Sequence, residues 1–409
     1  MTSPTVVFED PTKERGTHAL VVGVGHYPHL MGGGAQQYLP FQGLRQLSAA
    51  PLSARRIATW LLTSFHHPEM PLRSVSLLLS EREPMPFVWT EDAEGRRLVV
   101  PNGAPAARSP QDPRPDDAIA VADYATLQEA AKHWFVRGHE HEGNQLLFFF
   151  SGHGLGAASD VGLLLRDFGG DPTGGLSGML DLRVLRLGMR RCAARKQVWF
   201  VDACRTPSST IAGAEGYLGE SPIKPGMVLS GSPCISPLFH STIQGHKAYG
   251  RPGDVTLFTE ALLGALEGGG SLDLQGDGVW HVTPGVLHQS LAVPLKHAAR
   301  EHGELQIPAT DSLTEDFSIH VLRGAPRVPV YILCSPEEAT NVANLRCASV
   351  LDGRVETRQP MPGAWRIALS QGRYSFEATF ATGVPWKSIS KHVDIRPPTR
   401  EYSLGVSHG

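Results

Sequence analysis

Runs of consecutive apolar residues alternate with segments of helical periodicity over the first three quarters of the chain. Four of these runs predict buried strands, because continuous apolar stretches of this length are typical of strands covered on both faces; they lie at 18–23, 75–79, 146–151 and 198–202. Helices are predicted from Pro51, from the Thr126 and Glu129 capping-box pair to about residue 136, and over 182–192. This alternation favours a doubly wound, mainly parallel sheet.

The pattern changes twice further along the chain. A fifth strand is predicted at 227–230, and helices follow over 257–266 and from Pro284 to about residue 302. From about residue 325 the chain consists of short β-rich runs separated by turn residues, at 328–334, 344–351, 364–369, 374–380 and 389–395. We therefore predict an α/β domain over 1–324, with a large portion to about 205 and a small portion from about 226, followed by a small β-sandwich domain over 325–409.

Composition limits the classes of function. The net charge of −3 gives no electrostatic reason to expect nucleic acid or a membrane surface as partner. The N-terminus has no signal-peptide pattern, and no apolar stretch is long enough to span a bilayer. Five cysteines without a C-x-x-C pair favour neither a disulfide framework nor a zinc site, so we expect a cytoplasmic protein.

Two of the buried strands each deliver one reactive side chain at their end. His153 follows the strand in LLFFFSGHG, and Cys204 follows the strand in VWFVDACR. Because ligands bind outside the carboxyl ends of parallel strands, we expect both side chains in one crevice. An imidazole beside a thiol is the minimal machinery for nucleophilic cysteine catalysis. The spacing of 51 residues is close to the separation of about 50 typical of caspases.

The segments Ser151-Gly152-His153-Gly154 and Asp202-Ala203-Cys204-Arg205 resemble the two signature motifs of the caspase-like cysteine peptidases, most closely metacaspases and prokaryotic caspase homologues. The resemblance extends over about residues 15–315. It implies a caspase-like three-layer sandwich around the mainly parallel sheet. It also implies that Cys204 is the nucleophile, that His153 is the base that later protonates the leaving amine, and that the N–H groups of Gly154 and Cys204 form the oxyanion hole.

The same resemblance suggests the substrate. In metacaspases the residues equivalent to Ser151 and Asp202 line the pocket for the residue before the scissile bond, and a carboxylate there pairs with a cation. We therefore expect cleavage after Arg, then Lys. A second pocket acid of the family falls at about Ser53 in this chain, which reduces the expected charge. Ser230 and Ser232 are candidate walls for the peptide backbone.

The sequence also contains acidic residues that could bind a metal ion and four further cysteines. Calcium is the metal considered, with candidate ligands at Asp160, Asp167, Asp171, Asp273 and Asp277; because none of these segments forms a full calcium-binding loop, no metal site and no cofactor are expected. The remaining cysteines are expected to be structural; they are Cys192, Cys234, Cys334 and Cys347.

Two functions of different classes follow. The first is a cysteine endopeptidase that cleaves proteins at exposed Arg or Lys sites, and itself at candidate sites Arg96, Arg97, Arg108, Arg114 and Lys224. The resemblance adds an expected role in prokaryotic cell death or antiviral defence, with an activating protease or a regulatory partner that binds the C-terminal domain. The second is a catalytically silent caspase-fold scaffold that acts as a protein-interaction module. The intact pair of His153 and Cys204 favours the first.

Overall fold

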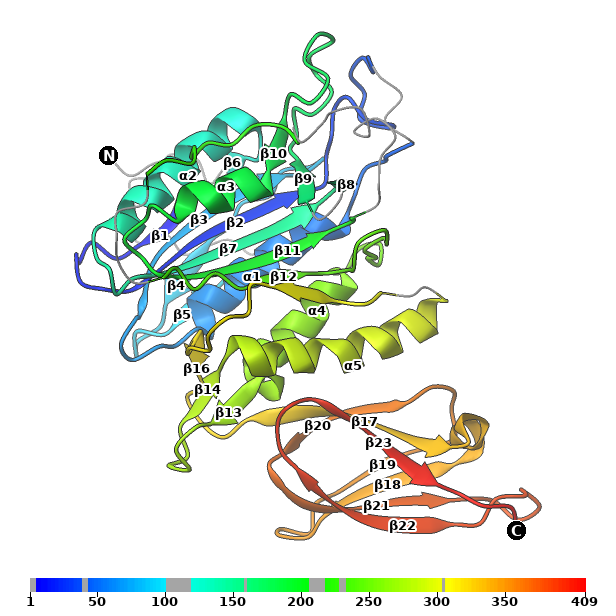
Figure 1. The fold of residues 1–409 in the computed structure, drawn as a ribbon. Coiled ribbons are helices and arrows are strands. Elements are labelled where there is room, and N and C mark those ends of the chain that lie inside the picture. Colours follow the sequence, from blue (N-terminus) through cyan, green and yellow to red (C-terminus); the bar gives the residue numbers. More distant parts are fainter. Residues whose placement is uncertain are drawn as a thin grey trace. The chain divides into compact units, whose positions relative to one another are not determined.

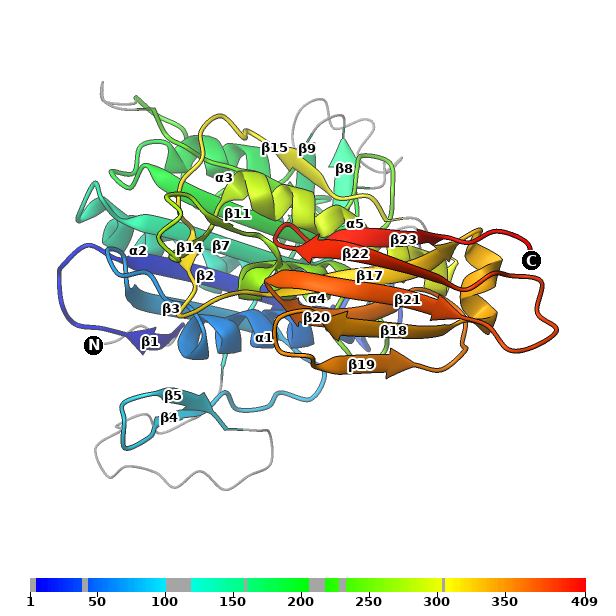
Figure 2. The ribbon, with the colours of Figure 1, turned by 90° about the horizontal axis from the view of Figure 1, so that it is seen from below.

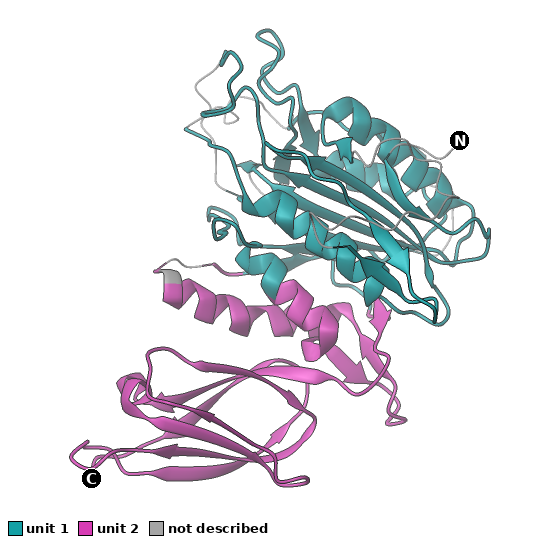
Figure 3. Cartoon of the chain, turned by 180° about the vertical axis from the view of Figure 1, so that it is seen from behind, with its two compact units in different colours: residues 1–260, 308–315 teal, residues 261–307, 316–409 magenta. Residues whose placement is uncertain are grey.

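The computed structural model describes residues 5–38, 43–100, 119–157, 160–205, 218–227, 233–303 and 306–409. The chain forms two compact units (Figure 3). The first comprises residues 1–260 and 308–315, and the second comprises 261–307 and 316–409. This division differs from the boundary predicted near residue 325, because residues 261–307 belong with the C-terminal strands.

The first unit is built on an eight-stranded mixed sheet (Figure 1). Its strands, in spatial order, are β1 (Val6–Glu9), β3 (Leu72–Ser80), β2 (Thr17–Val24), β7 (Gln145–Gly152), β11 (Lys196–Ala203), β12 (Leu238–His240) and β15 (Ala309–Asp311), with β6 (Ala120–Val121) paired to β3. All neighbours are parallel except β1 with β3 and β12 with β15. The predicted mainly parallel sheet is therefore present, and its carboxyl ends form one edge.

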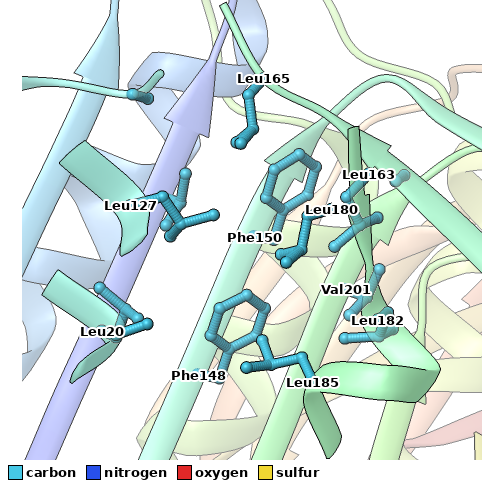
Figure 4. Close-up of a cluster of buried hydrophobic side chains, with 14 of the residues drawn as sticks. Leu20, Leu127, Phe148, Phe150, Leu163, Leu165, Leu180, Leu182, Leu185 and Val201 are labelled. Atoms are coloured by element: carbon cyan, nitrogen blue, oxygen red, sulfur yellow. The ribbon is translucent and has the colours of Figure 1, made fainter. Parts of the chain in front are cut away.

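Helices cover both faces of this sheet. On one face α2 (Tyr124–His139) and α3 (Leu182–Met189) pack on a fully apolar cluster that includes Leu20, Phe148 and Val201 (Figure 4). Alternate residues of the same strands point to the opposite face, toward α1 (Ala49–Thr63). There a Cβ at Gly23 would lie 2.6 Å from the Cβ of Ala54, so close packing of α1 on β2 requires glycine.

Two details of the predicted elements need correction. Helix α2 begins at Tyr124, because the Asp123 side chain accepts from the Thr126 N–H at 2.9 Å; the predicted capping box at Thr126 and Glu129 is wrong. The predicted strand at 227–230 lies mostly outside the described residues. The strand that follows β11 in the sheet is β12, whose three residues carry no periodic signal.

Shorter elements surround the main sheet in the first unit. Strands β8 (Gly154–Ala157), β9 (Asp160–Leu164) and β10 (Met179–Asp181) form a small antiparallel sheet directly after β7. Strands β4 (Trp89–Glu91) and β5 (Arg97–Val99) form a hairpin (Figure 2). Strand β5 contacts α1. Helix α4 (Leu257–Gly264) begins in this unit.

The second unit combines helical segments with three sheets. Its elements are a π-helical turn (Ala265–Gly269), β13 (Ser271–Asp273), β14 (Trp280–Val282), α5 (Pro284–His302), β16 (His320–Val321), β17 (Arg327–Ser335), a 3-10 helix (Glu337–Val342), β18 (Asn344–Ser349), β19 (Val355–Arg358), β20 (Trp365–Ser370), β21 (Gly372–Thr379), β22 (Ile389–Ile395) and β23 (Arg400–Gly405). One sheet is formed by β13, β14 and β16. The sheet β20-β17-β23 and the sheet β19-β18-β21-β22 share one apolar core, which includes Ile332 and Phe376. None of the helices in the described ranges is both long and apolar enough to cross a membrane.

Candidate active site

The register of β7 and β11 places the two candidate reactive residues side by side. These parallel neighbours pair Ser151 with Asp202 and Gly152 with Ala203. His153 and Cys204 are the next residues of each strand, so they occupy corresponding positions on backbones about 5 Å apart. Both line one cavity of about 510 Å³, whose walls are the loops at 43–50 and 247–252.

His153 is held by main-chain groups. Its Nε2–H donates to the carbonyl oxygen of Arg45 at 2.6 Å, because a carbonyl can only accept. In the neutral ring Nδ1 therefore carries the lone pair. The His153 main-chain N–H donates to the Tyr27 hydroxyl at 2.9 Å, and the two rings lie 5.0 Å apart. Burial lowers the pKa of His153, so the resting imidazole is neutral and able to accept a proton at Nδ1.

Cys204 is half-buried beside a backbone donor. The Ala248 N–H donates to its Sγ at 3.2 Å, a contact that stabilises a thiolate. Burial raises the pKa of the thiol, while the Ala248 N–H acts in the opposite direction. The resting residue is thus a neutral thiol, and a neighbouring base is needed to form the nucleophilic thiolate.

Gly154 is required by a close approach of two chain segments. A Cβ at this position would lie 2.5 Å from the carbonyl oxygen of Cys204, so no side chain fits. The Leu164 N–H donates to the His153 carbonyl at 3.0 Å, so one hydrogen bond continues the β8–β9 ladder beyond its first pair. That first pair, Gly154 with Leu163, is then a non-hydrogen-bonded pair, and the Gly154 N–H points away from β9.

Asp202 is a buried acid with one unpaired oxygen. Its Oδ2 accepts from the hydroxyls of Thr256, Thr259 (2.9 Å) and Ser151 (3.5 Å). Its Oδ1 has no donor among the described residues, although the residue is only 2 % exposed. Burial raises the pKa of Asp202 to about 6. Since Asp202 lines the cavity, it offers a partially satisfied carboxylate to whatever enters.

The position where the resemblance predicts a second acid lies in the same cluster. The Ser53 hydroxyl accepts from the Thr256 N–H at 3.0 Å, and Thr256 in turn donates to Asp202. Ser53 therefore contributes a neutral link to the site. Ser230 and Ser232, the candidate walls, lie outside the described residues.

Several residues of the site carried no recognised signal in the sequence. Arg45 and Ala248 act through main-chain atoms, which any residue type could supply. Tyr27, Thr256 and Thr259 form hydrogen bonds with partners more than fifty residues away, and local sequence patterns do not show such pairs.

The acidic residues considered for calcium have other partners. Asp160 pairs with Arg183 at 3.0 Å, Asp171 accepts from Thr173, and Asp273 accepts from the N–H groups of its own turn. Asp167 accepts from the N–H that starts α2. Within the described ranges, no group of three or more His, Cys, Asp or Glu side chains is arranged to hold a metal ion.

Comparisons with known proteins found similar structures but no similar sequences. No protein-family model matches the chain, and no curated protein matches its sequence. Among solved structures, the chain is similar to the protein GSU0716 from Geobacter sulfurreducens, with 13% identity and a TM-score of 0.38 over 72% of this chain and 92% of that one. It is also similar to caspase-1 from Spodoptera frugiperda, with 11% identity and a TM-score of 0.39 over 76% of this chain and 94% of that one.

Proposed function

We propose that this protein is a cysteine endopeptidase with Cys204 as nucleophile and His153 as general base. The observation that carries the proposal is the register of β7 and β11, which brings both residues to the wall of one cavity. The hydrogen bond from His153 Nε2 to the Arg45 carbonyl supports it, because this bond leaves Nδ1 as the proton acceptor. No third catalytic side chain is needed, because the Arg45 carbonyl accepts from the ring and the Tyr27 hydroxyl holds the His153 main chain.

The reaction proceeds in two stages. His153 Nδ1 takes the thiol proton as Cys204 Sγ attacks the scissile carbonyl carbon, and the carbonyl oxygen becomes an oxyanion. The N–H groups of Gly154 and Cys204 donate to this oxyanion. The imidazolium then gives its proton to the leaving amine, which breaks the peptide bond and leaves a thioester. Water, deprotonated by His153, hydrolyses the thioester and restores the thiol.

Asp202 and Ser151 would bind the side chain before the scissile bond. The unpaired Oδ1 of Asp202 favours a cation, so substrates with Arg, then Lys, at this position are expected. Thr256 and Thr259 fix the carboxylate from behind through Oδ2. Ser230 and Ser232 complete the proposed substrate-binding set.

The resemblance of the motifs also suggests where the protein acts and on which partners. The protein would act in the cytoplasm on exposed Arg or Lys sites in other proteins, as an effector in prokaryotic cell death or antiviral defence. An activating protease or a regulatory partner would bind the C-terminal domain. The proposal includes no nucleic acid, membrane or cofactor. Among the candidate self-processing sites, Arg96, Arg97 and Lys224 are described, whereas Arg108 and Arg114 lie outside the described residues.

The test is hydrolysis of fluorogenic peptides by the full chain. Cys204→Ala and His153→Ala should each lower kcat by about a thousandfold or more, since each removes a group that makes or breaks a bond. Cys234→Ala is the matched control, because Cys234 is also a half-buried free thiol but lies outside the cavity. Full activity in Cys204→Ala, or a preference for Asp before the scissile bond, would contradict the proposal. Binding without turnover and without an activated thiol would support the scaffold instead.

A further inference from the structure

The cavity at the candidate active site is lined by more cationic than anionic side chains. Among the described residues that line it, Asp202 is the one carboxylate and is buried, whereas three side chains are cationic: Arg45, Lys247 and Arg251. Arg251 lies 3.4 Å from Glu260 and 3.8 Å from Asp254, so its charge is compensated. Arg45 and Lys247 are exposed, and neither side chain has an ion-pair or hydrogen-bond partner among the described residues.

Each of these two residues is linked to one reacting group through the main chain, and both line the same cavity. Arg45 supplies the carbonyl that holds His153, and Lys247 directly precedes Ala248, whose N–H contacts Cys204. Because both side chains line the cavity that contains Asp202, a substrate cation that enters it meets their positive charge. Like charges within a Debye length of about 8 Å repel, so a peptide with only a basic residue is disfavoured at the rim.

We propose that Arg45 and Lys247 select substrates in which acidic residues lie within a few positions of the basic residue at the cleavage site. This inference rests on the proposed peptidase function and deepens it by naming the substrate class. An acidic side chain of the bound peptide would pair with the rim cations while the basic side chain reaches Asp202. The pattern that the cavity recognises is therefore mixed in charge, acidic residues beside a basic one.

The chain itself contains a segment with this pattern. In the turn between β4 and β5, the residues Glu91, Asp92 and Glu94 precede Arg96 and Arg97. The Arg96 side chain is 73 % exposed. This segment gives a probe whose sequence is taken from the protein, the peptide TEDAEGRRLV of residues 90–99.

The first experiment compares this peptide with a version in which its three acids are changed to the corresponding amides. With the full-length chain at low salt, we expect kcat/KM for the acidic peptide to be about five- to tenfold higher, the size expected for two exposed ion pairs. At about 0.5 M salt the ratio should approach one, because exposed charges are screened. A ratio of one at low salt would overturn the inference.

Substitutions locate the effect on the two side chains. Lys247→Gln and Arg45→Gln should each lower the ratio of kcat/KM between acidic and amide peptides, and the double variant should bring it to about one. The ratio is the readout because Arg45 also positions His153 through its carbonyl. Lys132→Gln is the matched control, since Lys132 is exposed on α2 and does not line the cavity. A ratio that survives in the double variant would contradict the assignment.

Binding separates this inference from the proposed function. Fluorescence anisotropy with the Cys204→Ala chain measures affinity for both peptides without turnover. If the normal chain cleaves neither peptide, yet Cys204→Ala binds the acidic one more tightly, the peptidase function fails and the selection by Arg45 and Lys247 stands. If both peptides are cleaved and bound equally well, the function stands and the selection fails.

Discussion

At the scale of single residues, the site is defined by which atoms are satisfied and which are not. His153 Nε2 is occupied by the Arg45 carbonyl, and Asp202 Oδ2 is occupied by threonine hydroxyls. The remaining atoms, Nδ1 of His153 and Oδ1 of Asp202, are therefore the ones available for chemistry and for substrate binding. Burial then sets their protonation: it lowers the pKa of the imidazole and raises that of the carboxyl group.

The Tyr27 hydroxyl accepts from the His153 main-chain N–H and so holds the candidate base in place. Tyr27→Phe would leave the His153 main-chain N–H without its acceptor and the Leu164 carbonyl without a donor, in a buried setting. We expect a loss of about 1–3 kcal/mol in the free energy of unfolding. We also expect a fall in kcat larger than any rise in KM, measured by urea denaturation and steady-state kinetics. Tyr402→Phe, which removes an exposed hydroxyl, is the control. An unchanged kcat would show that Tyr27 does not position the ring.

The pKa of Asp202 predicts a pH-dependent substrate preference. A carboxyl group with a pKa of about 6 is neutral below that pH and ionised above it, so its attraction for a cation appears as pH rises through 6. The ratio of kcat/KM for an Arg peptide to that for its citrulline counterpart should therefore rise across this range. The titrations of Cys204 and His153 cancel in the ratio. Asp202→Asn should make it flat with pH, and a pH-dependent ratio in that variant would argue against the role of Asp202.

At the scale of secondary-structure elements, the decisive feature is the pairing of β7 with β11. Ser151 and Asp202 are 51 residues apart and lie opposite each other, and the same offset separates His153 from Cys204. A slip of two residues in this register would separate the imidazole from the thiol by about 7 Å along the strand. The packing of the helices on the sheet holds the strands in place.

Close packing of α1 on β2 should be sensitive to a single methyl group. In Gly23→Ala the new Cβ would meet the Ala54 Cβ at 2.6 Å, so the helix must shift. We expect about 1–3 kcal/mol less stability toward urea unfolding, the usual cost of overpacking. Gly175→Ala is the control, because a Cβ there meets no atom within 4 Å. Equal stability of the two variants would mean that the interface between α1 and β2 relaxes freely.

At the scale of the whole molecule, the two compact units do not meet at residue 325, near which the short β-rich runs begin. After α5 it returns to the first unit to add β15, and it then continues into the C-terminal strands. Within the second unit, α5 is tied to those strands. Glu401 of β23 accepts from Lys296 and His297 at 2.8 Å each, and the His297 ring stacks on Tyr331 at 4.5 Å. Helix α5 and the C-terminal sheets therefore belong to one compact unit.

Truncation at residue 324 should therefore damage more than the sandwich. The fragment 1–324 loses both Tyr331 and Glu401, which leaves one face of α5 without its partners. Hydrogen exchange of α5 amides should be at least about tenfold faster in the fragment than in the full chain, because local opening becomes less costly. The amides of β7 and β11 should stay protected and serve as the internal control. Equal protection of α5 in both chains would support the domain boundary predicted near residue 325.

The sequence by itself determined the main sheet and the placement of His153 and Cys204 at the ends of two of its strands. Continuous apolar runs made the central strands predictable, since strands buried on both faces need no polar side, and His153 and Cys204 follow two of them directly. It did not predict the cap of α2 by Asp123 or the three-residue strand β12. Such short-range signals compete with tertiary contacts, and several neighbouring polar residues could equally have capped the helix.

Only the tertiary structure decided how the site is completed. The groups that hold His153 and Cys204 are main-chain atoms of Arg45 and Ala248, and a main-chain carbonyl or N–H leaves no mark on residue type. The hydroxyls that saturate one oxygen of Asp202 come from a segment 54 residues or more along the chain. Periodicity reports which face of an element is buried. Which distant loops close over an edge of the sheet depends on packing between elements, and that is set by the folded chain as a whole.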